Sequence, residues 1–237
     1  MLILAFDTST DICSIALANG KEIIKEINFA GERLHAQRLF PLMQQLFHET
    51  GYKINKTEIV AVGTGPGSFT GIRIAISAAE GLAMAIDKPV IGIMGLEAMA
   101  LRGCRQGRVV CSMIDARRRE IYACVYECMD DYNLKQIIKP AVWPVEEMCD
   151  LLYGYADIYI VGSGGVIYQT ILKEKLGDKI TFAEADDNYP HAGAIAYLAW
   201  RSCIKKDFIA ARKVEPTYLR QSEAEIRWGN LCRGNKN

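Results

Sequence analysis

Histidine is scarce in this sequence, which contains only His35, His48 and His191. No two of them have the i, i+4 spacing that places two imidazoles on one helical face, where they can share a metal. No Ser, Cys and His arrangement typical of a nucleophilic enzyme stands out either. The sequence therefore predicts no metal site and no catalytic residue. His35 and His191 each begin a predicted helix, and we expect them at the surface or at helix starts.

An excess of charge is also lacking, because 28 Lys and Arg balance 28 Asp and Glu over 237 residues. A net charge near zero gives no general attraction to nucleic acid or to an anionic membrane. No uncharged apolar run approaches the roughly 18 residues that a membrane span needs. The start, MLILAFDTST, lacks the basic region of a signal peptide. We therefore expect a cytoplasmic protein that does not contact a membrane.

The eight cysteines include no C-x-x-C pair. Their number alone permits disulfides, but several lie inside apolar runs such as VVCSMI and IYACVYEC. Cysteine in such runs is typical of a small core residue in a reducing compartment. We therefore expect buried thiols.

The order of apolar patterns predicts two α/β lobes. Both halves begin with antiparallel strands and then alternate helix and strand, as a duplicated lobe would. Asn19-Gly20 is predicted to form the hairpin turn between the second and third strands, because both residues tolerate positive φ. The expected strands are 2–6, 12–18, 21–29, 58–62, 89–93, 108–114, 120–127 and 157–161, and the expected helices are about 34–50, 70–87, 144–153, 165–175 and 191–205.

A basic, glycine-flanked break at Gly103–Gly107 separates the two predicted lobes. We assign residues 1–103 to a first lobe that carries the association helices, and residues 104–237 to a smaller second lobe. The last helix, about 191–205, could pack back on the first lobe.

The segment Gly63–Arg73, GTGPGSFTGIR, has the glycine content of a phosphate-binding loop but not the spacing of one. It fits neither G-x-x-x-x-G-K-[ST] nor G-x-G-x-x-G. Its glycines permit unusual φ, and Ser68 or Thr70 would cap the next helix. Two interpretations stay open: a structural turn that begins a helix, or a turn whose backbone amides hold an anion.

The two helices of the first lobe are more apolar than one buried face requires. From Ile72 to Ile86 the polar side chains are only Arg73, Ser77 and Glu80. This excess predicts a helix–helix protein interface, with a single large core as the alternative. The predicted interface residues are His35, Arg38, Leu39, Leu42, Met43, Leu46, Thr70, Arg73, Ile76, Ala79, Glu80 and Ala83.

Seven segments in order along nearly the whole chain resemble the bacterial TsaB family, also called YeaZ. They are ILAFDTSTDICSIAL, RLHAQRLFPLMQQLF, VGTGPGSFTGIRI, GLEAMA, MIDARRREIYACVY, VGSGG and EPTYLR. The resemblance implies an α/β fold of two ribonuclease-H-like lobes, as in actin, hexokinase and Hsp70. It implies a non-catalytic partner of the catalytic paralogue TsaD in tRNA threonylcarbamoyladenosine synthesis. It also implies self-association through the two helices of the first lobe.

The implied fold grips nucleotide phosphates between two hairpins and places adenosine against a glycine-rich turn. Asp7 and Ser9 lie in the first hairpin, and Gly162 and Gly164 lie in the turn. These four residues are the candidates for a vestigial nucleotide site. Asp7 could equally cap a turn, and any tight strand-to-helix turn favours glycine.

Two departures from the catalytic paralogue predict that this chain is inactive. The tip of the second hairpin, Asp115–Glu120, has no glycine for a close approach to phosphate, and Arg119 stands where the family often has one. The paralogue carries H-x-x-x-H where this chain has Gly95 and Met99. The chain therefore needs no cofactor of its own, although ATP or ADP could bind at a subunit junction.

Three functional hypotheses follow. The first is a scaffold that binds TsaD and itself, works with the ATPase TsaE, and meets tRNA only through the complex. The second is an actin-like-fold kinase or a peptidase that is active alone. The third is direct tRNA binding through a cluster of arginines, with weak and salt-sensitive affinity. That cluster comprises Arg102, Arg105, Arg108, Arg117, Arg118 and Arg119.

Overall fold

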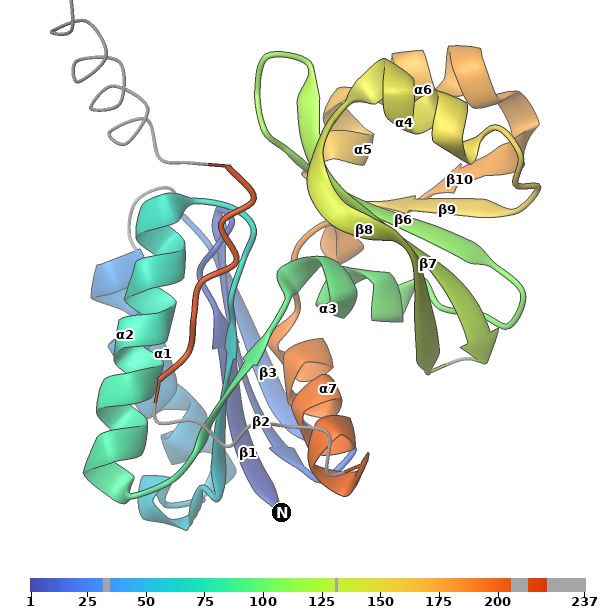
Figure 1. Ribbon diagram of the computed structural model, residues 1–237. Coiled ribbons are helices and arrows are strands. Elements are labelled where there is room, and N and C mark those ends of the chain that lie inside the picture. Colours follow the sequence, from blue (N-terminus) through green and yellow to red (C-terminus); the bar gives the residue numbers. More distant parts are fainter. Residues whose placement is uncertain (32–34, 131, 206–212, 221–237) are drawn as a thin grey trace, which may run out of the picture.

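The computed structural model describes residues 1–31, 35–130, 132–205 and 213–220 (Figure 1). Its two lobes are each built on a five-stranded mixed sheet. The first sheet has the order β3-β2-β1-β4-β5 and the second the order β10-β9-β6-β7-β8. The strands are β1 (Leu2–Asp7), β2 (Ile12–Asn19), β3 (Glu22–Ala30), β4 (Ile59–Gly63), β5 (Val90–Ile93), β6 (Val109–Asp115), β7 (Glu120–Asp130), β8 (Asn133–Pro144), β9 (Ile158–Val161) and β10 (Ile180–Phe182).

The two sheets share one topology. In each, three consecutive strands pair antiparallel, and the next two add in parallel to the free side of the first strand. Reading β8-β7-β6-β9-β10 beside β3-β2-β1-β4-β5 makes the equivalence plain. The predicted duplication of an α/β lobe is therefore confirmed.

Helices separate and cover the two sheets, so that the molecule is layered (Figure 1). Two helices cover one face of the first sheet and α7 covers the other, while α3 lies between α7 and the second sheet. Two helices of the second lobe cover the far face of its sheet. The helices are α1 (His35–Thr50), α2 (Phe69–Ile86), α3 (Gly95–Arg102), α4 (Val145–Leu152), α5 (Ser163–Ile167), α6 (Gln169–Leu176) and α7 (Ala192–Lys205), with short 3-10 turns at Ile54–Lys56, Gly177–Lys179 and Ala185–Asp187.

The alternation along β1 explains why the first sheet is buried on both faces. Successive side chains of a strand point to opposite faces. Leu4 and Phe6 join the core under α1 and α2, whereas Ile3 and Ala5 join the core under α7. All four are fully buried. The first lobe is therefore a three-layer unit whose outer helical layer is α1 and α2.

The structure departs from the predicted elements at three places. The hairpin turn is Gly20-Lys21, because Asn19 pairs with Glu22, and only Gly20 of the predicted pair has a positive φ, 62°. The helix predicted over 165–175 is two short helices, α5 and α6. The helix α3 and the strands β8 and β10 were not among the predicted elements.

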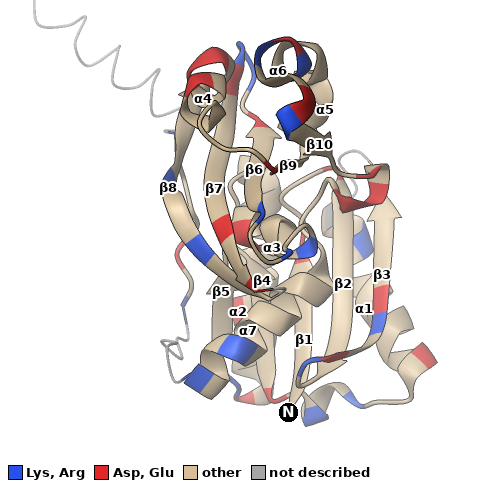
Figure 2. Ribbon diagram, turned by 90° about the vertical axis from the view of Figure 1, so that its right-hand side faces the viewer, with Lys and Arg blue, Asp and Glu red and all other residues tan. Residues whose placement is uncertain are grey.

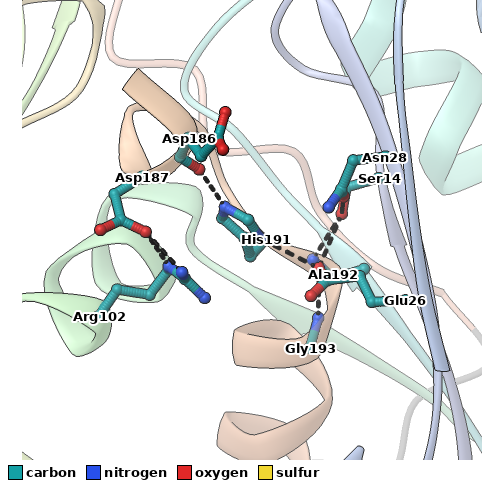
Figure 3. Close-up of polar contacts among 9 residues, drawn as sticks. All are labelled: Ser14, Glu26, Asn28, Arg102, Asp186, Asp187, His191, Ala192 and Gly193. Carbon is teal, nitrogen blue, oxygen red and sulfur yellow. Dashed lines mark hydrogen bonds and ion pairs between the residues drawn. The ribbon is translucent and has the colours of Figure 1, made fainter. Parts of the chain in front are cut away.

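A buried polar network holds the N-terminus of α7 to the first sheet (Figure 3). The Oε1 atom of Glu26, on β3, accepts from the Gly193 amide at 3.1 Å and lies 3.2 Å from Nδ1 of His191. The Ser14 hydroxyl accepts from the Ala192 amide at 2.8 Å. These contacts occupy backbone donors that the first turn of a helix leaves without partners. His191, predicted at the surface or at a helix start, does precede α7 but is only 5% exposed.

We expect this network to make stability fall at acid pH. Burial raises the pKa of Glu26, but hydrogen bonds from His191, Gly193 and Ser14 outweigh it and leave the pKa below its usual 4.5. A carboxyl with a lowered pKa stabilises the fold above its unfolded value, and that stabilisation is lost as pH falls through the folded value. In urea unfolding at pH 7, Glu26→Ala should cost about 1–3 kcal/mol by leaving buried donors without an acceptor. The variant should also lose less stability than wild type below about pH 4.5; parallel pH profiles would contradict the assignment.

Candidate functional site

Most of the predicted interface residues lie inside the core of the first lobe rather than on its surface. Seven side chains are at most 8% exposed and pack against β1, β2 and β4. The prediction that they face a partner is corrected, because they hold α1 and α2 on the sheet. These residues are Leu39, Leu42, Met43, Leu46, Ile76, Ala79 and Ala83.

Two other predicted interface residues contact a segment from the end of the chain. We call Lys213–Arg220 the C-terminal segment; it runs beside α2 towards the second lobe (Figure 1). The Val214 amide donates to Oε1 of Glu80 at 2.9 Å, and Nε of Arg73 donates to the Tyr218 hydroxyl at 2.9 Å.

The remaining predicted interface residues have mixed outcomes. Arg38 and Thr70 are exposed, and the guanidinium of Arg38 lies 5.1 Å from the centre of the Phe29 ring. The side chain of His35 lies outside the described part of the structure.

The exposed face of α2 is uncharged from Ser77 to Ala85. Four exposed residues follow each other at helical spacing: Ser77, Gly81, Met84 and Ala85. Met84 is 81% exposed, and a Cβ at Gly81 would meet no heavy atom within 4 Å. On the neighbouring helix, Phe40 is 52% exposed. We call Ser77, Gly81, Met84 and Ala85 the α2 face.

By length and composition, α2 is the one described helix that could cross a membrane, with 33% of it buried. Core helices of soluble proteins pass the same test, so the property is weak support for a span. The helix carries Arg73 and Glu80, and its other side covers the first sheet. We interpret it as a sheet-covering helix with an apolar outer face.

A cleft of about 1070 Å³ lies between the lobes, lined by both lobes and by the C-terminal segment. Its volume lies slightly above the usual range for small-molecule sites, roughly 300–1,000 Å³. Phe69 and Tyr218 stack in its wall with ring centres 4.7 Å apart. Thr217 holds the segment at the end of β4, because its amide donates to the carbonyl of Thr64, the residue after β4, at 2.9 Å.

The glycine-rich loop before α2 packs against the turn between β1 and β2. The Ser68 amide donates to the Ser9 carbonyl at 2.7 Å, and the Thr8 hydroxyl donates to the Gly71 carbonyl at 2.7 Å. A Cβ at Gly71 would lie 2.0 Å from the Thr8 carbonyl oxygen, and one at Gly67 would lie 2.3 Å from that of Ser9. These glycines are therefore required by backbone-to-backbone packing, which favours the structural interpretation of the loop. Ser68 caps α2, as predicted for it or Thr70, by accepting from the Gly71 amide at 3.2 Å.

Asp7 lies beneath this loop and is fully buried. Its Oδ1 atom accepts from the amide and the hydroxyl of Ser9, both at 2.8 Å, while Oδ2 has no partner among the described residues. Burial raises the pKa of Asp7 from 3.8 to about 6, although the Ser9 hydrogen bonds oppose the shift. Of the two predicted nucleotide contacts in this hairpin, Ser9 lines the cleft and Asp7 does not.

The raised pKa of Asp7 predicts a second pH dependence, opposite in sign to that of Glu26. A carboxyl with a raised pKa contributes stability that is present below its unfolded value, 3.8, and is lost as pH rises through about 6. Asp7→Asn should abolish this loss, so the variant should gain on the order of 2 kcal/mol relative to wild type between pH 4 and pH 7. Urea unfolding at the two pH values measures this difference; an equal change in both proteins would refute it.

Comparison with known proteins decides the family. A sequence profile described as "TsaD: tRNA N6-adenosine threonylcarbamoyltransferase" matches residues 22–228. The "tRNA threonylcarbamoyladenosine biosynthesis protein TsaB" of Haemophilus influenzae is 32% identical over 240 aligned positions, which cover 98% of this chain and 97% of the relative. The chain belongs to the TsaB family. The protein of the same name from Escherichia coli is 31% identical over 94% of this chain and 96% of its own length.

Solved structures agree with membership of the TsaB family. "YeaZ from Pseudomonas aeruginosa" superimposes with a TM-score of 0.76 at 31% identity, covering 92% of this chain and 99% of that one. A ROK hexokinase from Thermus thermophilus reaches a TM-score of 0.50 at 13% identity, a likeness of fold alone. The predicted fold class, two ribonuclease-H-like lobes of the actin and hexokinase type, is confirmed.

In this TsaB-family chain the glycines of the second-lobe turn are explained by contact with a neighbouring strand. A Cβ at Gly162, whose φ is 108°, would lie 2.3 Å from the Met113 carbonyl oxygen, and one at Gly164 would lie 3.1 Å from it. Neither glycine lines the cleft, whereas Ser163 between them does. Of the four residues predicted for a nucleotide, only Ser9 therefore faces the cleft.

The two positions where the catalytic paralogue of TsaB is expected to carry histidines lie in the packed interior. A Cβ at Gly95 would lie 3.0 Å from the Pro190 ring, and Met99 is fully buried in the core between α3 and the second sheet. Within the described ranges, no three His, Cys, Asp or Glu side chains gather as a metal site would require.

Proposed function

We propose that this chain is a non-catalytic subunit in tRNA threonylcarbamoyladenosine biosynthesis that binds the transferase TsaD through the α2 face. The observation that carries the proposal is the exposed stripe of Ser77, Gly81, Met84 and Ala85. Small residues allow two helices to approach closely, and an uncharged, flexible methionine suits a packed interface. A glycine inside an exposed helix lowers stability by roughly 0.5–1 kcal/mol relative to alanine. A partner helix that crosses closely at this point would explain why Gly81 is there.

The choice of partner rests on relatedness. Curated relatives are named for tRNA threonylcarbamoyladenosine biosynthesis, and the profile that matches residues 22–228 is that of the transferase itself. Two chains of one fold would each offer a helix pair equivalent to α1 and α2, and the four helices would form a bundle. A second copy of this chain would use the same face, so the homodimer and the heterodimer would compete for it.

A non-catalytic role agrees with the residues found at the two positions where the paralogue is expected to bind its metal. Gly95 and Met99 offer no metal ligand where the paralogue is expected to have a histidine pair. Catalysis is therefore assigned to TsaD, and this chain requires no cofactor. We further propose that the ATPase TsaE joins the assembled complex, that ATP or ADP binds at a subunit junction, and that the complex works in the cytoplasm.

Reconstitution from purified subunits tests the proposal. Mixing the chain with the TsaD protein of the same organism should give a heterodimer by light scattering after size exclusion. With TsaE, ATP and the activated threonylcarbamoyl donor, tRNA modification should require both proteins. Modification of tRNA by this chain without TsaD, lost on Asp7→Ala, would overturn the non-catalytic assignment.

A further inference from the structure

The hairpin tip between β6 and β7 is held by contacts from three directions. We call residues Ala116–Arg119 the arginine tip. The Arg119 carbonyl accepts from the Val145 amide at 3.2 Å, and the Arg119 guanidinium pairs with Glu146 at the start of α4. The Ala116 carbonyl accepts from Arg220 of the C-terminal segment at 2.9 Å.

Asp115 at the base of the tip holds it through one of its carboxylate oxygens. Its Oδ1 atom accepts from the Arg117 amide at 3.0 Å and from the Tyr168 hydroxyl at 2.9 Å. The backbone closes with the Ala116 amide donating to the Glu120 carbonyl at 2.9 Å. These hydrogen bonds and the ion pair hold the backbone of the tip in one position.

Two side chains of the arginine tip take no part in this anchoring. Arg117 and Arg118 are exposed, line the cleft, and have no side-chain partner among the described residues. Other members of the predicted basic cluster are engaged elsewhere: Arg102 with Asp187 and Arg108 with Asp157. Arg105 lines a separate hollow beside α3 and α7. Of the predicted cluster, only Arg117 and Arg118 therefore offer guanidinium groups at the cleft that have no partner among the described residues.

The backbone of the tip makes these two groups unusual. Arg117, Arg118 and Arg119 all have positive φ, at 63°, 57° and 61°. This region costs a residue with a side chain roughly 1–2 kcal/mol, and glycine would occupy it without that cost. Backbone strain of this kind persists only where the surrounding structure enforces it, and strained residues are most frequent at functional sites. The cost is understandable if the arginine side chains themselves are needed.

We propose that Arg117 and Arg118 bind phosphate groups of RNA when tRNA approaches the assembled complex. The proposal rests on the proposed function, which supplies the tRNA. A guanidinium presents a planar fork of donors that matches two phosphate oxygens. Figure 2 shows basic residues at the turn that joins the end of β6 to the start of β7, near the acidic residues of α4. Because Arg119 is paired with Glu146, about two positive charges remain for the ligand.

RNA is favoured over a nucleotide held inside the cleft because of the other charges there. Asp11, Asp115, Glu120 and Asp186 also line the cleft. A phosphate inside it would lie among these carboxylates, of which Glu120 is paired with Arg220. At the exposed tip, an extended polyanion could reach both guanidiniums from solvent. The contact would be independent of sequence, because phosphates position a nucleic acid without reading its bases.

Fluorescence anisotropy with labelled tRNA tests the proposal over a range of salt concentrations. In the complex with TsaD, Arg117→Ala/Arg118→Ala should weaken binding about 5- to 50-fold and lower the slope of log affinity against log salt by about one to two. Arg117→Lys/Arg118→Lys should restore much of the slope, because the charges return. Lys53→Ala/Lys56→Ala, which removes the same charge from exposed residues beside α1, should change neither quantity.

Three controls separate the outcomes. Light scattering without RNA reports subunit association, so a failure there counts against the proposed function only. Titration of the isolated chain at low salt, where attraction to phosphate is strongest, tests the tip whether or not TsaD binds. Arg117→Gly/Arg118→Gly removes both charges and relieves the backbone, so it should fold at least as well as wild type. Unchanged affinity in these variants, or complete displacement of tRNA by micromolar ADP, would overturn the proposal.

Discussion

Replacing Met84 by glutamate is expected to weaken association with TsaD strongly and to leave the chain folded. The side chain is 81% exposed in the chain alone, so the new carboxylate would stay in water in the free subunit. In the complex it would be buried between apolar helices without a partner, which is strongly unfavourable. We expect affinity to fall about 100-fold or more, roughly 3 kcal/mol. Isothermal titration calorimetry measures the affinity, and circular dichroism verifies the fold.

A matched control places the same charge on the opposite side of the first lobe. Ile204 lies near the end of α7 and is 65% exposed, so Ile204→Glu repeats the chemistry of Met84→Glu away from α2. It should leave both association and stability unchanged. Ser77→Glu, on the α2 face itself, should reproduce the loss. If Met84→Glu and Ser77→Glu both bind TsaD like wild type, the α2 face is not the interface.

The burial of a residue also determines whether a substitution there can test the interface. Leu42 and Ala79 were predicted at the interface, but they are 8% and 0% exposed and belong to the core beneath α1 and α2. A charge at either position would unfold the lobe, and the resulting loss of binding would say nothing about the interface. The interface test therefore belongs on side chains that are exposed before association.

The apolar pattern predicted where α1 and α2 lie but not which of their sides faces out. The ranges 34–50 and 70–87 match the observed helices to within one residue at each end, because the 3.6-residue period is strong. In a helix that is apolar almost all round, however, the pattern does not say which stripe meets the sheet. That depends on the path of β1 and β4, which only the tertiary structure specifies.

The elements that were missed lacked a local signal. β8 carries Pro140 and Pro144, which argue against a central strand, but it is the edge strand of its sheet and tolerates them. The burial of His191 depends on Glu26, a residue 165 positions away. The positive φ values of Arg117 to Arg119 contradict residue preference, so no reading of local preference would find them.

Two glycines of α2 should respond in opposite directions to the same change. Gly71→Ala should lower the free energy of unfolding by about 3 kcal/mol or more, because its Cβ would lie 2.0 Å from the Thr8 carbonyl oxygen. Backbone on both sides of that contact leaves no flexible side chain to give way. Gly81→Ala, ten residues further along the helix, should raise the same quantity by about 0.5–1 kcal/mol, since the new methyl group meets nothing.

Urea unfolding of the two variants distinguishes the structural from the anion-binding interpretation of the glycine-rich segment Gly63–Arg73. Gly71→Ala should be much less stable than wild type, because Gly71 joins the loop before α2 to the turn between β1 and β2. Gly81→Ala should be the more stable chain and yet bind TsaD more weakly, since the added methyl group would hold the helices apart. A loop built to cradle phosphate through free amides predicts otherwise: Gly71→Ala would then keep its stability and lose only ligand binding. The sign and size of the Gly71 effect therefore decide between the structural and the anion-binding interpretations of Gly63–Arg73.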